Sequence, residues 1–157
     1  MIVVVMGVAG SGKTTIGKLL AARLGCAFLD GDDFHPPQNV AKMAAGTALT
    51  DEDRWPWLEN LNRNLLENRN AVLACSALKE SYRSVLSKGL PDCRFVHLRG
   101  SIELIRARLG ERRHRYMPAS LLESQFATLE PPAGALEIDI AHAAAKCVEA
   151  IASALGR

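Results

Sequence analysis

The chain has 157 residues, a length typical of one compact domain. With 48% hydrophobic and 23% charged residues it can bury a core, it is neither disordered nor fibrous, and it contains no apolar run as long as a membrane span. A net charge of +2 is too small to indicate nucleic-acid binding by itself. The four cysteines are widely spaced and form no C-x-x-C pair, so neither a disulfide framework nor a zinc site is indicated, and we expect a cytoplasmic protein.

The first predicted elements are a buried strand over residues 2–6, the segment G-V-A-G-S-G-K-T over residues 7–14, and a helix over residues 14–24. This order is the context of the phosphate-binding loop G-x-x-x-x-G-K-[ST], in which backbone N–H groups and a helix N-terminus surround an anion. We expect Lys13 to reach the β- and γ-phosphates of ATP and Thr14 to coordinate Mg²⁺. The expected nucleotide-binding residues of this segment are Gly7, Val8, Ala9, Gly10, Ser11, Gly12, Lys13, Thr14 and Thr15. With the loop this close to residue 1, we expect no signal or transit peptide.

The second strand, over residues 27–29, ends at the acidic segment D-G-D-D over residues 30–33. A kinase needs one carboxylate to orient the acceptor hydroxyl and take its proton, and often a second near the metal. Side-chain alternation places Asp30 and Asp32 on the same side of an extended segment, so it does not separate their roles. We predict that Asp32 orients the hydroxyl and Asp30 lies nearer Mg²⁺. The alternative is an acidic turn in which Asp33 caps a helix.

The rest of the chain predicts further alternation of helices and strands. A short helix closes at Gly46, and Thr50-x-x-Asp53 resembles a capping box, although Pro56 does not fit deep in a helix and favours Asp53 as the cap. Ser101 is the predicted cap of a later helix. The helices are expected over residues 38–45, 53–67, 78–86, 101–109 and 140–155, and the strands over 71–75, 95–98 and, more weakly, 136–140. This pattern predicts a single doubly wound α/β domain over residues 1–157, with a parallel sheet between two helical layers and ligands at the carboxyl ends of the strands.

Longer motifs along the chain resemble the gluconokinase family. They are D-G-D-D-F-H-P at 30–36, D-E-D-R-W-P-W-L at 51–58, C-S-A-L-K at 75–79 and L-L-E-S-Q-F-A-T-L-E at 121–130. The resemblance runs from residue 2 to about residue 139, and each block is more specific than the phosphate-binding loop. It implies ATP-dependent phosphorylation of D-gluconate at its 6-hydroxyl by a P-loop kinase related to nucleoside-monophosphate kinases, usually a homodimer.

An anionic polyol such as gluconate requires a cation pair for its carboxylate and polar groups for its hydroxyls. The expected substrate-binding residues are Asp32, His35, Lys42, Arg54, Lys79, Arg83 and Gln125. Lys79 and Arg83 lie one helical turn apart, which favours them as the carboxylate pair, whereas a solvated surface charge is the alternative for each cation. Trp57 and Tyr82 are interpreted as packing residues, and Trp55 is left open between packing and contact.

A basic run over residues 106–115 alternates with apolar residues and predicts an amphipathic helix that leads into a mobile lid over about 108–122. We predict that Arg112 stabilises charge in the transition state and that Arg108 lies near the adenine. The family carries Gly-His-Phe in this lid, where this chain has His114-Arg115-Tyr116, so the role of a lid histidine is not transferred.

Three other functions compete with a gluconokinase. Shikimate kinases share the loop and the Asp-x-Asp pair but carry a Gly-Gly-Gly turn where this chain has C-S-A-L-K. A nucleotide-binding module without catalysis would have lost Lys13, Thr14 or the two aspartates, all of which are present. A nucleic-acid binder would need a larger basic surface with aromatic residues, so no nucleic-acid or membrane partner is expected.

Overall fold

The structure, a computed structural model, describes residues 1–111 and 121–157. Its five described strands form one parallel sheet in the order β2-β3-β1-β4-β5. The strands are β1 (Ile2–Met6), β2 (Ala27–Asp30), β3 (Ala71–Ala74), β4 (Cys93–Arg99) and β5 (Leu136–Asp139). All five lie within a few residues of the predicted segments. Because the strands are parallel, the loops that follow them meet at one edge of the sheet, where ligands bind in such folds.

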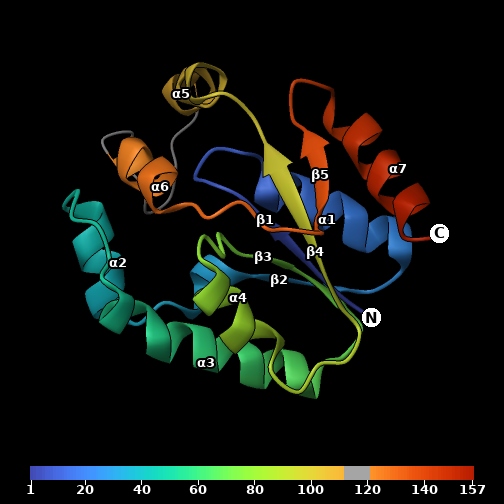
Figure 1. Cartoon of the computed structure of the whole chain (residues 1–157), viewed down its shortest axis with the longest axis horizontal. Helices are drawn as coiled ribbons and strands as arrows, with labels where there is room; N and C mark the ends of the chain where they lie inside the picture. Colours follow the sequence, from blue (N-terminus) through green and yellow to red (C-terminus); the bar gives the residue numbers. More distant parts are fainter. Residues whose placement is uncertain (112–120) are drawn as a thin grey trace.

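The helices cover both faces of this sheet (Figure 1). Helices α1 and α7 pack together on one side, α3 and α4 pack together on the other, and α5 and α6 lie near the carboxyl ends of the strands. They are α1 (Lys13–Leu24), α2 (Pro37–Ala44), α3 (Asp51–Glu67), α4 (Glu80–Ser87), α5 (Ile102–Glu111), α6 (Leu122–Thr128) and α7 (Ala144–Ala154), with a 3-10 helix η1 (Gly31–Phe34). This is the predicted α/β/α arrangement, although η1 and α6 were not predicted and α7 begins later than expected. Within the described residues, no helix combines the length and apolar character needed to cross a bilayer.

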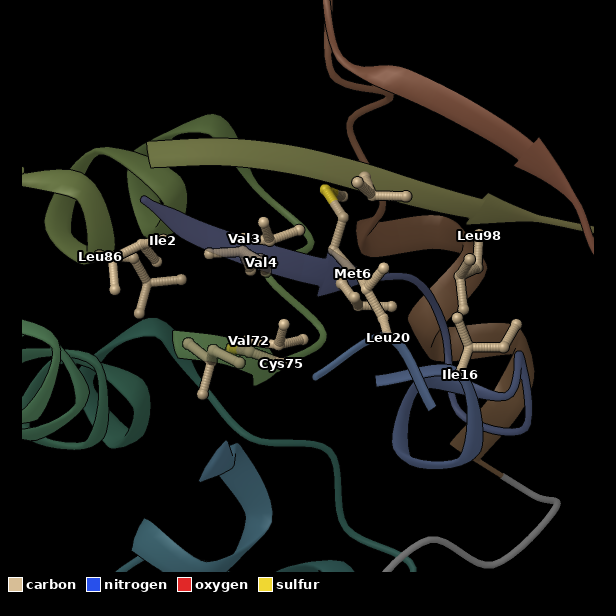
Figure 2. Close-up of a cluster of buried hydrophobic side chains, with 14 of the residues drawn as sticks. Ile2, Val3, Val4, Met6, Ile16, Leu20, Val72, Cys75, Leu86 and Leu98 are labelled. Atoms are coloured by element: carbon tan, nitrogen blue, oxygen red, sulfur yellow. The ribbon is translucent and has the colours of Figure 1, made fainter. Parts of the chain in front are cut away.

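The core lies around β1, the central strand, which is buried along its whole length. Its branched residues favour an extended backbone and pack on both faces of the sheet. Figure 2 shows Val3, Val4 and Met6 of β1 in one buried cluster with Ile16 and Leu20 of α1, with Met6 lying nearest Leu20. Burying each such side chain stabilises the fold by about 2 kcal/mol. The phosphate-binding loop that follows β1 is therefore anchored at both ends by core elements.

Helix α3 begins earlier than the sequence predicted. Thr50 is its N-cap, since Thr50 Oγ1 accepts from Asp53 N at 3.2 Å and Asp53 Oδ2 accepts from Thr50 N at 2.9 Å. The capping box is thus confirmed, and the assignment of Asp53 as the cap is wrong. Pro56 lies inside the helix and removes the hydrogen bond to the carbonyl of Glu52. The capping box and the burial of Trp57 and its neighbours offset this loss.

Candidate active site

The loop between β1 and α1 has the backbone geometry of an anion-binding nest. Gly10 has a φ of +78° and Gly12, the N-cap of α1, has a φ of +96°, a region that side chains disfavour. A Cβ on Gly10 would also lie 2.7 Å from Leu109 Cγ, so a larger residue does not fit there. The first N–H groups of α1 have no partner within the helix and point toward the loop. The loop can therefore bind phosphate through its backbone, as its sequence predicts.

A cavity of about 560 Å³ opens beside this loop. Lys13, Thr14, Asp30 and Asp32 line one part of it, and Arg108 lines another together with the segment 140–144. Arg108 Nη2 donates to Ile140 O at 2.6 Å, which holds α5 against the segment that follows β5. The structure thus brings the predicted phosphate, metal and hydroxyl-orienting residues into one cavity, with Arg108 on its wall.

Hydrogen bonds orient the polar and charged side chains that line this cavity. Thr14 Oγ1 donates to Asp30 Oδ2 at 3.3 Å, and Lys13 Nζ donates to Val8 O at 2.9 Å. Burial lowers the pKa of the Lys13 ammonium, and the charges of Asp32 and Asp30 oppose this shift. The residues fit Mg²⁺–ATP, because a magnesium site typically combines one hydroxyl and one carboxylate with phosphate oxygens and water.

The two aspartates are brought together by a turn rather than by an extended strand. Asp30 is the last residue of β2 and caps η1, since Asp30 Oδ1 accepts from Asp32 N at 3.0 Å. The alternative in which Asp33 caps a helix is wrong, because Asp30 is the N-cap of η1 and Pro36 is the N-cap of α2. Because Asp32 lies in η1, side-chain alternation along a strand does not place it. A short polar side chain that bonds the backbone two residues on is a frequent way to start such a turn.

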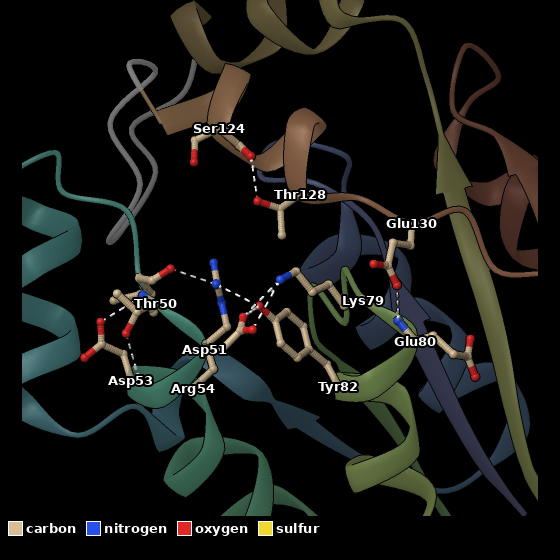
Figure 3. Close-up of polar contacts among 11 residues, drawn as sticks. Thr50, Asp51, Asp53, Arg54, Lys79, Glu80, Tyr82, Ser124, Thr128 and Glu130 are labelled. Carbon is tan, nitrogen blue, oxygen red and sulfur yellow. Dashed lines mark hydrogen bonds and ion pairs between the residues drawn. The ribbon is translucent and has the colours of Figure 1, made fainter.

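A second group of polar residues lies between α3 and the start of α4 (Figure 3). Lys79 Nζ bonds both oxygens of Asp51, at 3.2 and 3.3 Å, and Arg54 Nη1 donates to Tyr82 Oη at 2.9 Å. The Tyr82 hydroxyl in turn donates to Asp51. Trp55 packs edge-on against the Tyr82 ring, with ring centroids 5.6 Å apart. Two of the predicted substrate cations, Arg54 and Lys79, are thus adjacent.

Asp51 and the Tyr82 hydroxyl were not predicted as functional groups. Tyr82 is buried, as its interpretation as a packing residue implies, but its hydroxyl joins Arg54 to Asp51. The general need of a buried tyrosine hydroxyl for a partner is the signal that would have found this contact.

His35 and Lys42 stand beside the start of α3. Lys42 Nζ lies 2.7 Å from Asp53 Oδ2, and this contact contributes most to lowering the pKa of Asp53 to about 2. The His35 ring stacks on Trp57 with centroids 4.0 Å apart. Burial, helped by Arg54, lowers the pKa of His35 to about 4, so this ring is neutral near pH 7. Trp57 is buried and donates from Nε1 to Gly31 O at 2.8 Å, which confirms it as a packing residue.

Arg83 does not join the other predicted substrate cations. It is 3% exposed, and its guanidinium donates to Ala77 O at 2.7 Å and Glu130 O at 2.9 Å and pairs with Glu80. Lys79 and Arg83 do not share a helix face, because Lys79 is the N-cap of α4 and has an extended backbone. Its side chain therefore leaves the chain in a different direction from that of Arg83.

Gln125 of α6 contacts the phosphate-binding loop. Gln125 Oε1 accepts from Ala9 N at 2.7 Å, and the side chain is buried. Its predicted substrate role is not tested by this contact, but the contact shows that α6 supports the loop. Arg112 and the lid motif His114-Arg115-Tyr116 lie outside the described residues, as does most of the predicted lid over 108–122. Their roles stay predictions from the sequence.

Comparison with known proteins identifies the family. A family model described as shikimate kinase matches residues 9–129. A probable gluconokinase of Xenopus tropicalis is 47% identical, with the match covering 84% of this chain and 80% of the relative. The thermosensitive gluconokinase of Escherichia coli K12 is 46% identical, with 93% of this chain and 82% of the relative covered. The chain belongs to the gluconokinase family.

The solved structure of a gluconokinase from Sinorhizobium meliloti 1021 agrees with this assignment. It superposes on this gluconokinase-family chain with a TM-score of 0.90 at 42% identity, covering 99% of this chain and 91% of the other. Membership makes the chain a kinase that uses a P-loop fold and ATP, and it does not favour the non-catalytic alternative. The match to the shikimate kinase model reflects the wider group that shares this fold, whereas the relatives of high identity are gluconokinases.

Proposed function

We propose that this chain catalyses the Mg²⁺-dependent transfer of the γ-phosphoryl group of ATP to the 6-hydroxyl of D-gluconate. The observation that carries the proposal is the convergence of Lys13, Thr14, Asp30 and Asp32 on one cavity, in a chain whose relatives are named gluconokinases. Phosphoryl transfer depends mainly on positioning and on charge stabilisation, and these four groups supply both.

Binding of ATP rests on the loop and on the first turn of α1. The backbone N–H groups of residues 10–15 would surround the β-phosphate, and the Lys13 ammonium would offset charge on the oxygen between the β- and γ-phosphates. Thr14 and Asp30 would hold Mg²⁺, which supplies positive charge to the phosphate oxygens when it is bound. Arg108, fixed against Ile140 O, would pack near the adenine.

Asp32 is the proposed general base. Its carboxylate shares the cavity with Lys13, so a hydroxyl held by Asp32 would face the phosphates that Lys13 contacts. Asp32 would orient the 6-hydroxyl and accept its proton as the new P–O bond forms. Asp30 is less suited to this role, because one of its oxygens accepts from Asp32 N and the other from Thr14 Oγ1.

The carboxylate end of gluconate would bind Arg54 and Lys79. These cations are partly exposed and adjacent, whereas Arg83 is buried and bonded to backbone carbonyls. We therefore propose that Arg83 positions the segment before α4 instead of contacting the substrate. Lys42 and His35 would lie beside the hydroxyls, and Arg112 would stabilise the transition state.

Three further properties belong to this proposal. The chain is proposed to form a single domain over residues 1–157, to act in the cytoplasm and to assemble as a homodimer. A length of 157 residues supports a single domain, and the homodimer that is usual in the family supports the same assembly here. The wide spacing of the four cysteines supports a reducing compartment such as the cytoplasm. Analytical ultracentrifugation of the purified protein tests the homodimer: a species of one chain's mass at micromolar concentration contradicts it.

A coupled ADP-release assay across sugar acids tests the function. D-Gluconate should give rapid, Mg²⁺-dependent turnover, whereas shikimate and a reaction without acceptor should give only background. Phosphorus NMR of the product should show one new phosphomonoester, coupled to the two protons on C6. Turnover with shikimate but not with gluconate would replace this proposal by the shikimate kinase alternative.

A further inference from the structure

Asp51, Arg54, Lys79 and Tyr82 form a polar cluster between α3 and α4, and a chain of hydrogen bonds connects them. We call this chain of hydrogen bonds the relay. Arg54 donates to the Tyr82 hydroxyl, that hydroxyl donates to Asp51, and Asp51 accepts from Lys79. Both cations also lie over the Tyr82 ring, with Arg54 Cζ at 5.2 Å and Lys79 Nζ at 5.6 Å from its centroid. Tyr82 therefore contacts both cations, Arg54 through its hydroxyl and ring and Lys79 through its ring.

The relay is fixed on its buried side and open on the other. Tyr82 is 1% exposed, whereas the Lys79 and Asp51 side chains are 30% and 39% exposed. Burial, together with the bond to Asp51, raises the pKa of Tyr82 to about 12, so its hydroxyl keeps the proton that it donates. The bonds from Tyr82 and Lys79 lower the pKa of Asp51, which keeps this carboxylate charged near pH 7. A ligand would thus contact the charged groups of Arg54 and Lys79. Both groups contact Tyr82, which is buried and cannot move without disrupting the core packing.

The charge of the cluster selects among ligands. Arg54 and Lys79 supply two positive charges and Asp51 one negative charge, so a net charge of +1 remains. Lys42, on α2, is paired with Asp53, so it does not change the net charge of the cluster. A net single charge matches a ligand with one carboxylate, because a neutral ligand leaves the cations uncompensated and a dianion leaves an excess negative charge near Asp51.

We propose that Asp51 and Tyr82 are positioning residues that hold Arg54 and Lys79 as a receptor for sugar acids with a single carboxylate. This inference rests on the proposed function and adds its basis of specificity: aldonates are accepted, whereas the neutral alditols and the dianionic aldarates of the same carbon chain are not. Arg54 and Lys79 contact the carboxylate, and Asp51 and Tyr82 act through them.

Replacing Tyr82 by Phe tests the positioning role. Tyr82→Phe keeps the ring and the core packing but removes the hydroxyl between Arg54 and Asp51. The KM for gluconate should rise about 10-fold, whereas kcat and the KM for ATP should stay within about 2-fold. Asn62→Leu is the matched control, because it removes a buried side-chain bond farther along α3, where Asn62 Nδ2 donates to Leu86 O. It should lower the melting temperature and leave the KM for gluconate unchanged. An equal effect of both variants on that KM would overturn the inference.

Replacing Asp51 by Asn tests the charge balance, because it raises the net charge of the cluster by one. D-Glucarate has two carboxylates and no primary hydroxyl, so it serves as a competitive inhibitor. The ratio of its inhibition constant to the KM for gluconate should fall at least about 5-fold in Asp51→Asn. D-Glucitol, which is neutral, should bind the unsubstituted protein at least about 10-fold more weakly than gluconate. A ratio that Asp51→Asn leaves unchanged would overturn the selection by charge.

Titration calorimetry with gluconate separates this inference from the function on which it rests. If gluconate binds with the expected dependence on Tyr82 and Asp51 but is not phosphorylated, the proposed function is wrong and the receptor is supported. If gluconate is phosphorylated and Tyr82→Phe binds it as tightly as the unsubstituted protein does, the receptor is wrong and the function stands.

Discussion

Gln125 Oε1 accepts a hydrogen bond of 2.7 Å from Ala9 N, which joins α6 directly to the phosphate-binding loop. Glu130, the second residue after α6 ends at Thr128, forms the other end of this connection. Glu130 N donates to Leu78 O at 2.7 Å, and Glu130 Oε1 accepts from Glu80 N at 2.9 Å. Helix α6 and the segment that follows it are therefore bonded both to the loop that faces ATP and to the start of α4, next to Lys79. The two halves of the candidate site share this support.

Replacing Gln125 by Met should weaken ATP binding. The change leaves the buried Ala9 N–H without its acceptor, which costs about 1–3 kcal/mol and loosens the loop. We expect a higher KM for ATP and a lower melting temperature, whereas Ser124→Ala on the same helix should change neither. Steady-state kinetics with each substrate varied in turn decide the outcome. A rise in the KM for gluconate without a change for ATP would instead support the substrate role that the sequence predicted for Gln125.

Replacing Lys13 by Ala or Met should abolish phosphoryl transfer and leave the fold intact. The ammonium lies in the cavity with Asp30 and Asp32 and donates to Val8 O. Met keeps the length of the aliphatic stem. A loss of turnover in both variants would therefore show that the charge of Lys13, and not its packing, is required. Circular dichroism checks the fold. Near-normal turnover by a folded variant would remove Lys13 from the reaction.

The two aspartates should respond differently to replacement by Asn. Asp32→Asn should lower kcat by a factor of about 10² to 10⁴ with little change in the KM for ATP, because a general base is lost. Asp30→Asn should mainly raise the Mg²⁺ concentration needed for half-maximal rate. A magnesium titration of each variant at saturating ATP measures both effects. If Asp30→Asn loses kcat and Asp32→Asn changes only the magnesium requirement, the two roles are exchanged.

Replacing Arg83 by Met should destabilise the protein more than it weakens substrate binding. The guanidinium satisfies the carbonyls of Ala77 and Glu130, and its loss should lower the free energy of unfolding by about 2–3 kcal/mol. Urea denaturation measures this change, and kinetics at a temperature where the variant is folded should show both KM values within about 3-fold. An unchanged stability with a strongly raised KM for gluconate would return Arg83 to the substrate contact that the sequence predicted.

His35 should make stability depend on pH in an acidic range. Its pKa is about 4 in the folded protein and about 6.5 in the unfolded chain, so the unfolded chain binds more protons between these values. The contribution of His35 to stability is therefore fully present above about pH 6.5 and is lost as the pH falls toward 4. His35→Phe keeps an aromatic ring against Trp57 and should show a smaller fall in melting temperature over this range. Equal falls in both proteins would contradict the assigned pKa.

The nucleotide half of the site could be predicted from the sequence because it is local. The residues of the phosphate-binding loop are contiguous, the glycines at 10 and 12 need positive φ angles, and the helix that follows begins where its pattern indicates. The parallel strands were also predicted closely, since each is a short apolar run between helices. Such features depend on neighbouring residues and on burial, both of which the residue types specify.

The substrate half was decided by contacts between residues far apart in the chain. Lys79 and Arg83 are close in sequence, but an extended N-cap at Lys79 separates their side chains, whereas Arg54 comes to the Tyr82 hydroxyl from another helix. The capping of η1 by Asp30 likewise replaced the expected alternation. Composition, spacing and motif therefore determined which residue types are present and what chemistry they allow. The tertiary structure decided which cations are buried as supports and which remain open to a ligand, because burial and the choice of hydrogen-bond partner depend on the packing of α3 against α4 and on the bonds that Glu130, after α6, makes to the start of α4.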